Sequence, residues 1–186
     1  MPIHFQGRIR PGNAHLHGYA TAQAIARLTT QHFGQWRNAI QPAGGGGLGV
    51  GSCCAAFTVN PNADYPAVFP HPFALVLGNS QLAAQGMIWH QGWNVGGHAE
   101  RAALNVANHE GCVPWLGPHG AVLYVELEPC QHCAQWLQGQ HNPYRAFFLA
   151  HDLLVWWGWN YPAQVQNMVN FHGLPLPMQN VVVANW

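Results

Sequence analysis

Two short motifs carry the residue types best suited to chemistry. A histidine and a glutamate stand two positions apart at His98 and Glu100, and two cysteines stand three positions apart at Cys130 and Cys133. Imidazole and thiolate groups are ligands that zinc prefers, and catalytic zinc sites use three protein ligands and keep a fourth position open. Residues three apart on a helix share one face. The motifs therefore predict a zinc (Zn²⁺) site made by His98, Cys130 and Cys133.

Glu100 predicts a different role from that of the three ligands. If its carboxylate bound the metal, the open position would be filled. It is better placed to carry protons between metal-bound water and a substrate. A Cys-x-x-Cys pair alone also fits a redox pair or half of a structural zinc site. A redox pair leaves Glu100 without a role, and a closed structural site needs a fourth ligand.

The composition limits the classes of protein that fit this chain. It has 186 residues, 49% of them hydrophobic and only 6% charged, with no lysine and a net charge of zero. A strong overall positive field for nucleic acid is therefore not expected, although arginines can build a local one. The odd number of cysteines, five, resembles no disulfide framework and favours a reducing compartment. We expect a cytoplasmic protein with no membrane partner and leave its oligomeric state open.

Alternating apolar runs and helical patterns predict an α/β fold. Residues 1–51 are expected to form an extension with one helix and a glycine-rich linker, and residues 52–186 the main domain. Residues 1–18 read as irregular. Helices are predicted at 19–40, 98–109, 130–137 and 162–171, and strands at 53–59, 73–78, 86–90, 121–127, 145–150 and 181–184.

The two motifs and the residues around them resemble the cytidine deaminase-like superfamily of zinc-dependent nucleobase deaminases. The likeness lies in residues 92–94, 98–104 and 123–133 and is greatest to tRNA adenosine deaminases and to bacterial toxin and nucleic-acid-editing deaminases. Such enzymes carry H-x-E followed by P-C-x-x-C. The resemblance implies a three-layer α/β/α fold with a mixed five-stranded sheet whose last two strands are parallel. It also implies zinc on the three predicted ligands and a proton shuttle at Glu100.

The resemblance also suggests substrate contacts. It implies that the backbone at Ala99 helps to place the base and that Asn94 bonds to it, with Asn79 as the rival asparagine. Three tryptophans, Trp156, Trp157 and Trp159, fall in a segment predicted as a loop, where they would stack on bases or else belong to the core.

These observations lead to one expected function and two alternatives. A helical crossover between the strands at 145–150 and 181–184 would make them parallel, which resembles the nucleic-acid editors. We therefore expect deamination of cytosine to uracil in single-stranded DNA or RNA. The enzyme would act in the cytoplasm of its own cell or, as a toxin-type deaminase, in the cytoplasm of a target cell. The first alternative is deamination of adenosine in tRNA or of a free base or nucleotide, such as guanine or a pyrimidine nucleotide. The second is a zinc-stabilised binding module without activity.

Overall fold

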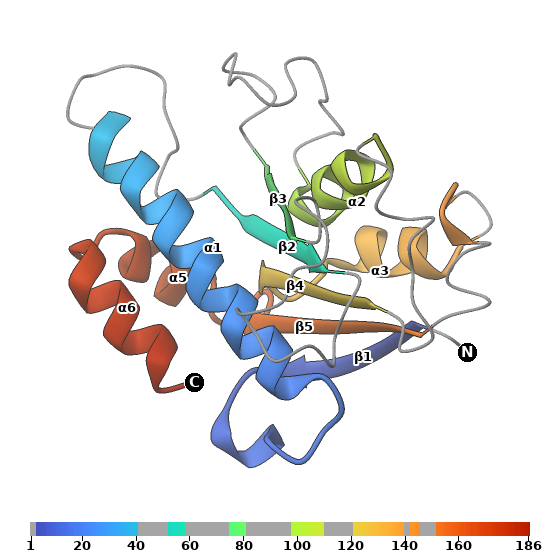
Figure 1. The fold of residues 1–186 in the computed structure, drawn as a ribbon, viewed down its shortest axis with the longest axis horizontal. Helices are drawn as coiled ribbons and strands as arrows, with labels where there is room; N and C mark the ends of the chain where they lie inside the picture. Colours follow the sequence, from blue (N-terminus) through green and yellow to red (C-terminus); the bar gives the residue numbers. More distant parts are fainter. Residues whose placement is uncertain are drawn as a thin grey trace.

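One mixed sheet organises the chain (Figure 1). The computed structural model describes residues 3–40, 52–58, 75–80, 98–109, 121–139, 142–145 and 152–186. In these residues five strands follow the order β1-β5-β4-β2-β3. Their bounds are β1 Ile3–Arg8, β2 Cys54–Thr58, β3 Leu75–Asn79, β4 Ala121–Leu127 and β5 Leu153–Trp159. The last two strands, β4 and β5, are parallel, and β2 is antiparallel to both β4 and β3. The predicted sheet type is confirmed.

Helices cover both faces of the sheet. On one face α2 and α3 enclose a core with Leu123 and Val125 of β4. On the other face α1, α5 and α6 enclose a second core with Tyr124 of β4 and Trp156 of β5. The helices are α1 Tyr19–Ile40, α2 Ala99–His109, α3 Gln131–Gln138, α5 Val165–His172 and α6 Leu176–Ala184. Neighbouring β4 residues thus point to opposite faces, as strand geometry requires, and the predicted three-layer α/β/α fold is confirmed.

A glycine in β3 sets the position of α2. A Cβ built on Gly78 would lie 2.5 Å from the backbone nitrogen of Ala103 and 2.8 Å from the carbonyl oxygen of Ala99. Any larger residue would therefore push α2 away from the sheet, because the atoms it meets belong to the backbone. The close approach fixes the start of α2, where His98 and Glu100 lie.

The N-terminal strand differs from the sequence prediction. Residues 1–18 read as irregular, yet β1 pairs in parallel with β5 from Ile3 to Arg8. Ile3 belongs to the core on the α2 side, and Phe5 packs against that core. The alternation of these apolar residues is a strand pattern that the nearby prolines and glycines mask. Two elements of the predicted extension, β1 and α1, therefore share the sheet and the core with the elements after residue 52.

Two C-terminal predictions are wrong. The segment expected to be a tryptophan-rich loop forms β5, and the strand expected at 181–184 is the end of α6. β5 is the central parallel strand between β1 and β4, so its residues are apolar on both faces, as buried parallel strands are. The valines of α6 have strand propensity, but packing against α1 decides their conformation. Because residues 181–184 are helical, the crossover expected to end there lacks its final strand, and β1 is the neighbour of β5 instead.

Other predicted elements agree or fall outside the described residues. The structure confirms the helix at 19–40 and the strand at 121–127 with the predicted bounds. The helix predicted at 130–137 and that predicted at 162–171 are found with small shifts, as α3 and α5. The glycine run at 44–47, the strand at 86–90 and residues 146–150 of another predicted strand lie outside the described residues. No helix in the described part of the chain is both long and apolar enough to cross a membrane.

Candidate metal centre and active site

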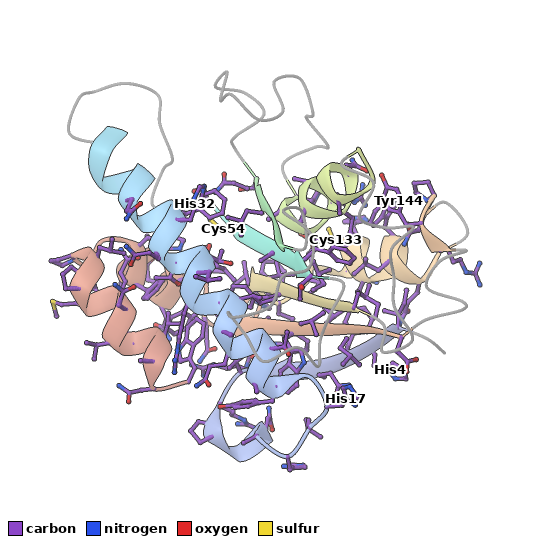
Figure 2. The ribbon with its side chains drawn as sticks, viewed as in Figure 1. His4, His17, His32, Cys54, Cys133 and Tyr144 are labelled. Carbon is purple, nitrogen blue, oxygen red and sulfur yellow. The ribbon has the colours of Figure 1, made fainter. Side chains whose placement is uncertain are left out.

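Three side chains from two helix starts converge on one point. The Nδ1 atom of His98 lies 3.1 Å from the Sγ of Cys133 and 4.0 Å from the Sγ of Cys130. The three ligand atoms all lie within 4.8 Å of one another. With Zn–N near 2.0 Å and Zn–S near 2.3 Å, tetrahedral coordination separates such atoms by roughly 3.5 Å. The donor types and their spacing therefore fit zinc, and Figure 2 shows Cys133 between the ribbons of α2 and α3.

Local backbone structure holds the ligands in place. His98 directly precedes α2, and its carbonyl accepts a hydrogen bond from the Ala102 nitrogen at 3.1 Å. Cys130 is the N-cap residue of α3, and its carbonyl accepts one from the Ala134 nitrogen at 2.9 Å. The Cys130 side chain makes no capping hydrogen bond, so its sulfur is not used by the helix. Partial positive charge at helix N-termini favours thiolates.

The electrostatics of the cluster call for a cation. Burial raises the pKa of the Cys133 thiol far above its ordinary value, and the nearby Glu100 and Cys130 raise it further. Two sulfurs and a carboxylate thus crowd together, and a bound dication reverses the shift because metal ligands bind deprotonated. Zinc in such a site acts as a Lewis acid and lowers the pKa of a coordinated water to about 7. His98, Cys130 and Cys133 are the zinc-binding triad.

A cavity of about 350 Å³ opens beside the triad. Glu100, in the first turn of α2, lines it although only 4% of the residue is exposed. Its described lining consists of Cys53, His98, Ala99, Glu100, Leu127, Glu128, Cys130, His132 and Tyr161. The cavity lies where the carboxyl ends of β4 and β5 meet, the edge at which parallel α/β sheets bind ligands. Two of the three ligands, His98 and Cys130, and the predicted proton carrier Glu100 thus line the same cavity.

The predicted substrate contacts divide into three groups. Ala99 lines the cavity, and its contact with the base stays a prediction. Asn94 lies outside the described residues. Asn79 is buried at the end of β3, where its Nδ2 donates to the Oγ of Ser52 at 3.3 Å and the Sγ of Cys54 at 3.0 Å. Asn79 is absent from the described lining, so its side chain organises the start of β2 instead.

The predicted tryptophan stacking surface is not supported at two of its three positions. Trp156 is fully buried and Trp159 is 8% exposed, and both belong to the core beneath α1 and α5. Bases cannot stack on rings that core side chains already cover. Trp157 is half-buried, and its Nε1 donates to the Oδ1 of Asn160 at 2.9 Å. The exposed aromatic ring that follows β5 is Tyr161, which is 47% exposed.

Five cavity residues were missed by the sequence prediction: Cys53, Leu127, Glu128, His132 and Tyr161. Cys53 is a free, half-buried thiol whose pKa is raised by burial, and next by the charge of Glu126. Its position just before a strand gives no chemical signal. Leu127 and Glu128 directly precede the second motif, and their closeness to it is a signal that could have been used. His132 lies between the two cysteines, outside the triad, and also reaches the cavity.

The comparisons agree with the geometry of this site. Residues 72–149 match the family model described as the cytidine and deoxycytidylate deaminase zinc-binding region, and the triad and Glu100 all fall in that segment. The site and the α/β/α fold define a zinc-dependent deaminase, a hydrolase. Residues 72–149 thus carry the zinc-binding region of the cytidine deaminase-like superfamily. Comparison with curated proteins and with solved structures gave no match.

Proposed function

We propose that the protein hydrolytically deaminates cytosine to uracil in single-stranded nucleic acid. The observation that carries the proposal is the shared cavity, which places the zinc-binding triad and Glu100 around one small space. The matching family description, which names cytidine and deoxycytidylate, supports cytosine as the base. A base in a duplex would have to leave its stack to enter such a cavity, so an unpaired strand is the simpler substrate.

The reaction needs a group that moves protons, and Glu100 fits this role. Deamination adds one water at C4 of the ring, breaks the C4–N bond to the exocyclic amine and releases ammonia. One proton must pass from water to ring N3 and another to the leaving amine. The Glu100 carboxylate lines the cavity and lies against Cys133. It is therefore close to the metal site without being one of the three ligands, which suits a carrier of protons.

The remaining wall suits a flat ring. Leu127 supplies an apolar surface, and Tyr161 supplies an exposed aromatic one. Stacking of a base on an aromatic side chain contributes about 1–3 kcal/mol. At about 350 Å³ the cavity is near the lower limit of ligand pockets, which span roughly 300–1,000 Å³. A single base or nucleoside fits that size, while the rest of a strand would lie outside.

Mass spectrometry of single-stranded oligonucleotides tests the proposal. Zinc-loaded protein should convert cytosine-containing strands of DNA or RNA to the uracil form, a gain of about one mass unit for each base. Glu100→Gln should retain zinc and lose turnover. His17→Ala should retain both, because this exposed histidine is neither a ligand nor part of the described cavity lining. Zinc-loaded protein that produces neither uracil nor any other deaminated base from these strands would overturn the proposal.

Free cytidine or deoxycytidylate is the second candidate substrate. The family description names both, and the zero net charge of the chain does not require a polyanionic partner. The same mass measurement decides between the candidates. Turnover of free cytidine and deoxycytidylate with no change in oligonucleotides would favour the free compounds over single-stranded nucleic acid as the substrate.

A further inference from the structure

β1 brings two arginines to the edge of the sheet at which the cavity opens. We propose that Arg8 and Arg10 bind phosphates of a single-stranded substrate next to the nucleotide whose base enters the cavity. The inference rests on the proposed function and names how its substrate is held. Sequence alone gave no reason to select these two of the six arginines, because residues 1–18 read as irregular.

Strand register places Arg8 and Arg10 at the same edge of the sheet as the cavity. Arg8 pairs with Trp157, and the Ile9 nitrogen continues the pairing by donating to the Trp157 carbonyl at 2.8 Å. Arg10 is also extended, with φ −161° and ψ 154°, so it follows toward the level of Trp159, which pairs with the cavity residue Leu127. Because neighbouring strands lie about 4.8 Å apart, β1 and β4 are separated by roughly 10 Å across β5. That separation suits a phosphate beside the bound nucleotide.

Contacts tie Arg8 to the cavity wall. Its Nε donates to the Gly158 carbonyl at 2.8 Å, and its guanidinium lies 5.3 Å from the centroid of the Trp159 ring. The Trp159 carbonyl in turn accepts from the nitrogen of Glu128 at 2.8 Å, and the Glu128 carboxylate accepts from the nitrogen of Tyr161 at 3.0 Å. Glu128 and Tyr161 both line the cavity. The guanidinium is thus oriented through Nε, and the described hydrogen bonds of Arg8 do not use the two Nη groups, which bind phosphate well.

The two charges lack a described counter-charge. The ion pairs found in the described residues join His4 to Asp152 and His172 to Glu126, and neither includes Arg8 or Arg10. Burial and the charge of Arg10 both lower the pKa of Arg8, as is expected for two cations two residues apart in one extended segment. A bound anion would offset this cost.

Two other arginines make contacts elsewhere. Arg27 donates to the carbonyl of Ala184, and Arg101 stacks on Trp136 with its guanidinium carbon 5.0 Å from the ring centroid. Arg27 is exposed on α1, so it provides a matched control that removes one charge at a distance from β1.

The test measures binding in the inactive Glu100→Gln background, so that turnover does not consume the strand. Fluorescence anisotropy with a labelled cytosine-containing oligonucleotide should show a dissociation constant raised about ten-fold or more for R8Q/R10Q at low salt. Each lost phosphate contact should also reduce the slope of log K against log salt by about 0.7, the value for single strands. R10Q alone, at an exposed position that cannot disturb the core, should give roughly half of the change. R27Q should bind like the background protein.

A competition experiment shows whether Arg10 binds the phosphate of the nucleotide in the cavity or that of a neighbouring nucleotide. The inhibition constant of unlabelled deoxycytidylate, corrected for the affinity of the labelled strand, should be the same for R10Q and for the background protein, because its own phosphate is not the one that Arg10 binds. A raised inhibition constant of deoxycytidylate in R10Q would overturn the assignment to a neighbouring phosphate. Unchanged oligonucleotide affinity and salt slope in R8Q/R10Q would overturn the inference while leaving the proposed function standing. The absence of any deaminated oligonucleotide from the wild-type protein would instead overturn the proposed function.

Discussion

A carboxylate oxygen of Glu126 in β4 lies 2.9 Å from the Nε2 of His172 in α5, and both side chains are almost completely buried. The other carboxylate oxygen accepts a hydrogen bond from the nitrogen of Cys54 at 2.8 Å. One acidic side chain therefore joins β4, β2 and α5 in the centre of the fold. Glu126 is two residues from Glu128, which lines the cavity, so this junction also supports the wall of the active site.

The first prediction concerns the stability that this junction provides. Glu126→Ala should reduce the free energy of unfolding by about 3–5 kcal/mol, because removal of one partner leaves His172 buried without its carboxylate. The exposed pair of His4 and Asp152 is the matched control, and Asp152→Asn should cost roughly 0–1 kcal/mol. Urea denaturation measures both variants. Equal losses in the two variants would show that the buried junction has no special role.

The second prediction separates zinc ligands from the other cavity thiol. Cys133→Ala should abolish stoichiometric zinc binding, because the site then has two ligands. Cys53→Ala should retain one zinc per chain, since Cys53 lies outside the triad although it lines the same cavity. Elemental analysis after dialysis measures the zinc content. Loss of zinc from Cys53→Ala, with folding intact by circular dichroism, would contradict the assignment of the triad.

The third prediction distinguishes two aromatic residues that are five positions apart. Tyr161→Ala should weaken oligonucleotide binding with little change in stability, whereas Tyr161→Phe should bind normally because stacking needs only the ring. Trp156→Ala should instead lower stability by about 3–5 kcal/mol, since it empties a buried site. Anisotropy and urea denaturation measure the two effects. A stable Trp156→Ala protein with weakened binding would restore the stacking role that burial argues against.

The fourth prediction concerns acid sensitivity. Burial lowers the pKa of His32 in α1 below its ordinary value of 6.5, so the unfolded chain binds a proton there more readily than the folded one. His32 should therefore stabilise the fold less as the pH falls through 6.5 toward its lower folded-state pKa, and not affect the pH dependence above that window. His32→Gln should remove this part of the acid destabilisation. The melting temperature of both proteins between pH 5 and pH 8 measures the difference, and parallel curves would refute it.

The zinc site was predictable from sequence because the geometry within each of its two motifs is local, although the tertiary structure brings the two motifs together. His98 and Glu100 are two positions apart at the start of one helix, and Cys130 and Cys133 are one turn apart at the start of another. Short spacing at a helix start fixes which side chains can face one ion, whatever the rest of the chain does. The sequence by itself therefore determined the triad, the nearby carboxylate and, through its periodic apolar runs, the α/β class.

The tertiary structure alone decided which strands and aromatic residues meet at the site. β1 and β5 pair across about 150 residues of chain, and no local pattern reveals a partner at that separation. The same pairing buries Trp156, leaves Tyr161 at the cavity and carries Arg8 to the carboxyl edge. Residues 181–184 become helical by packing against α1 despite their strand propensity. These outcomes depend on burial and pairing between distant segments, which override local preference.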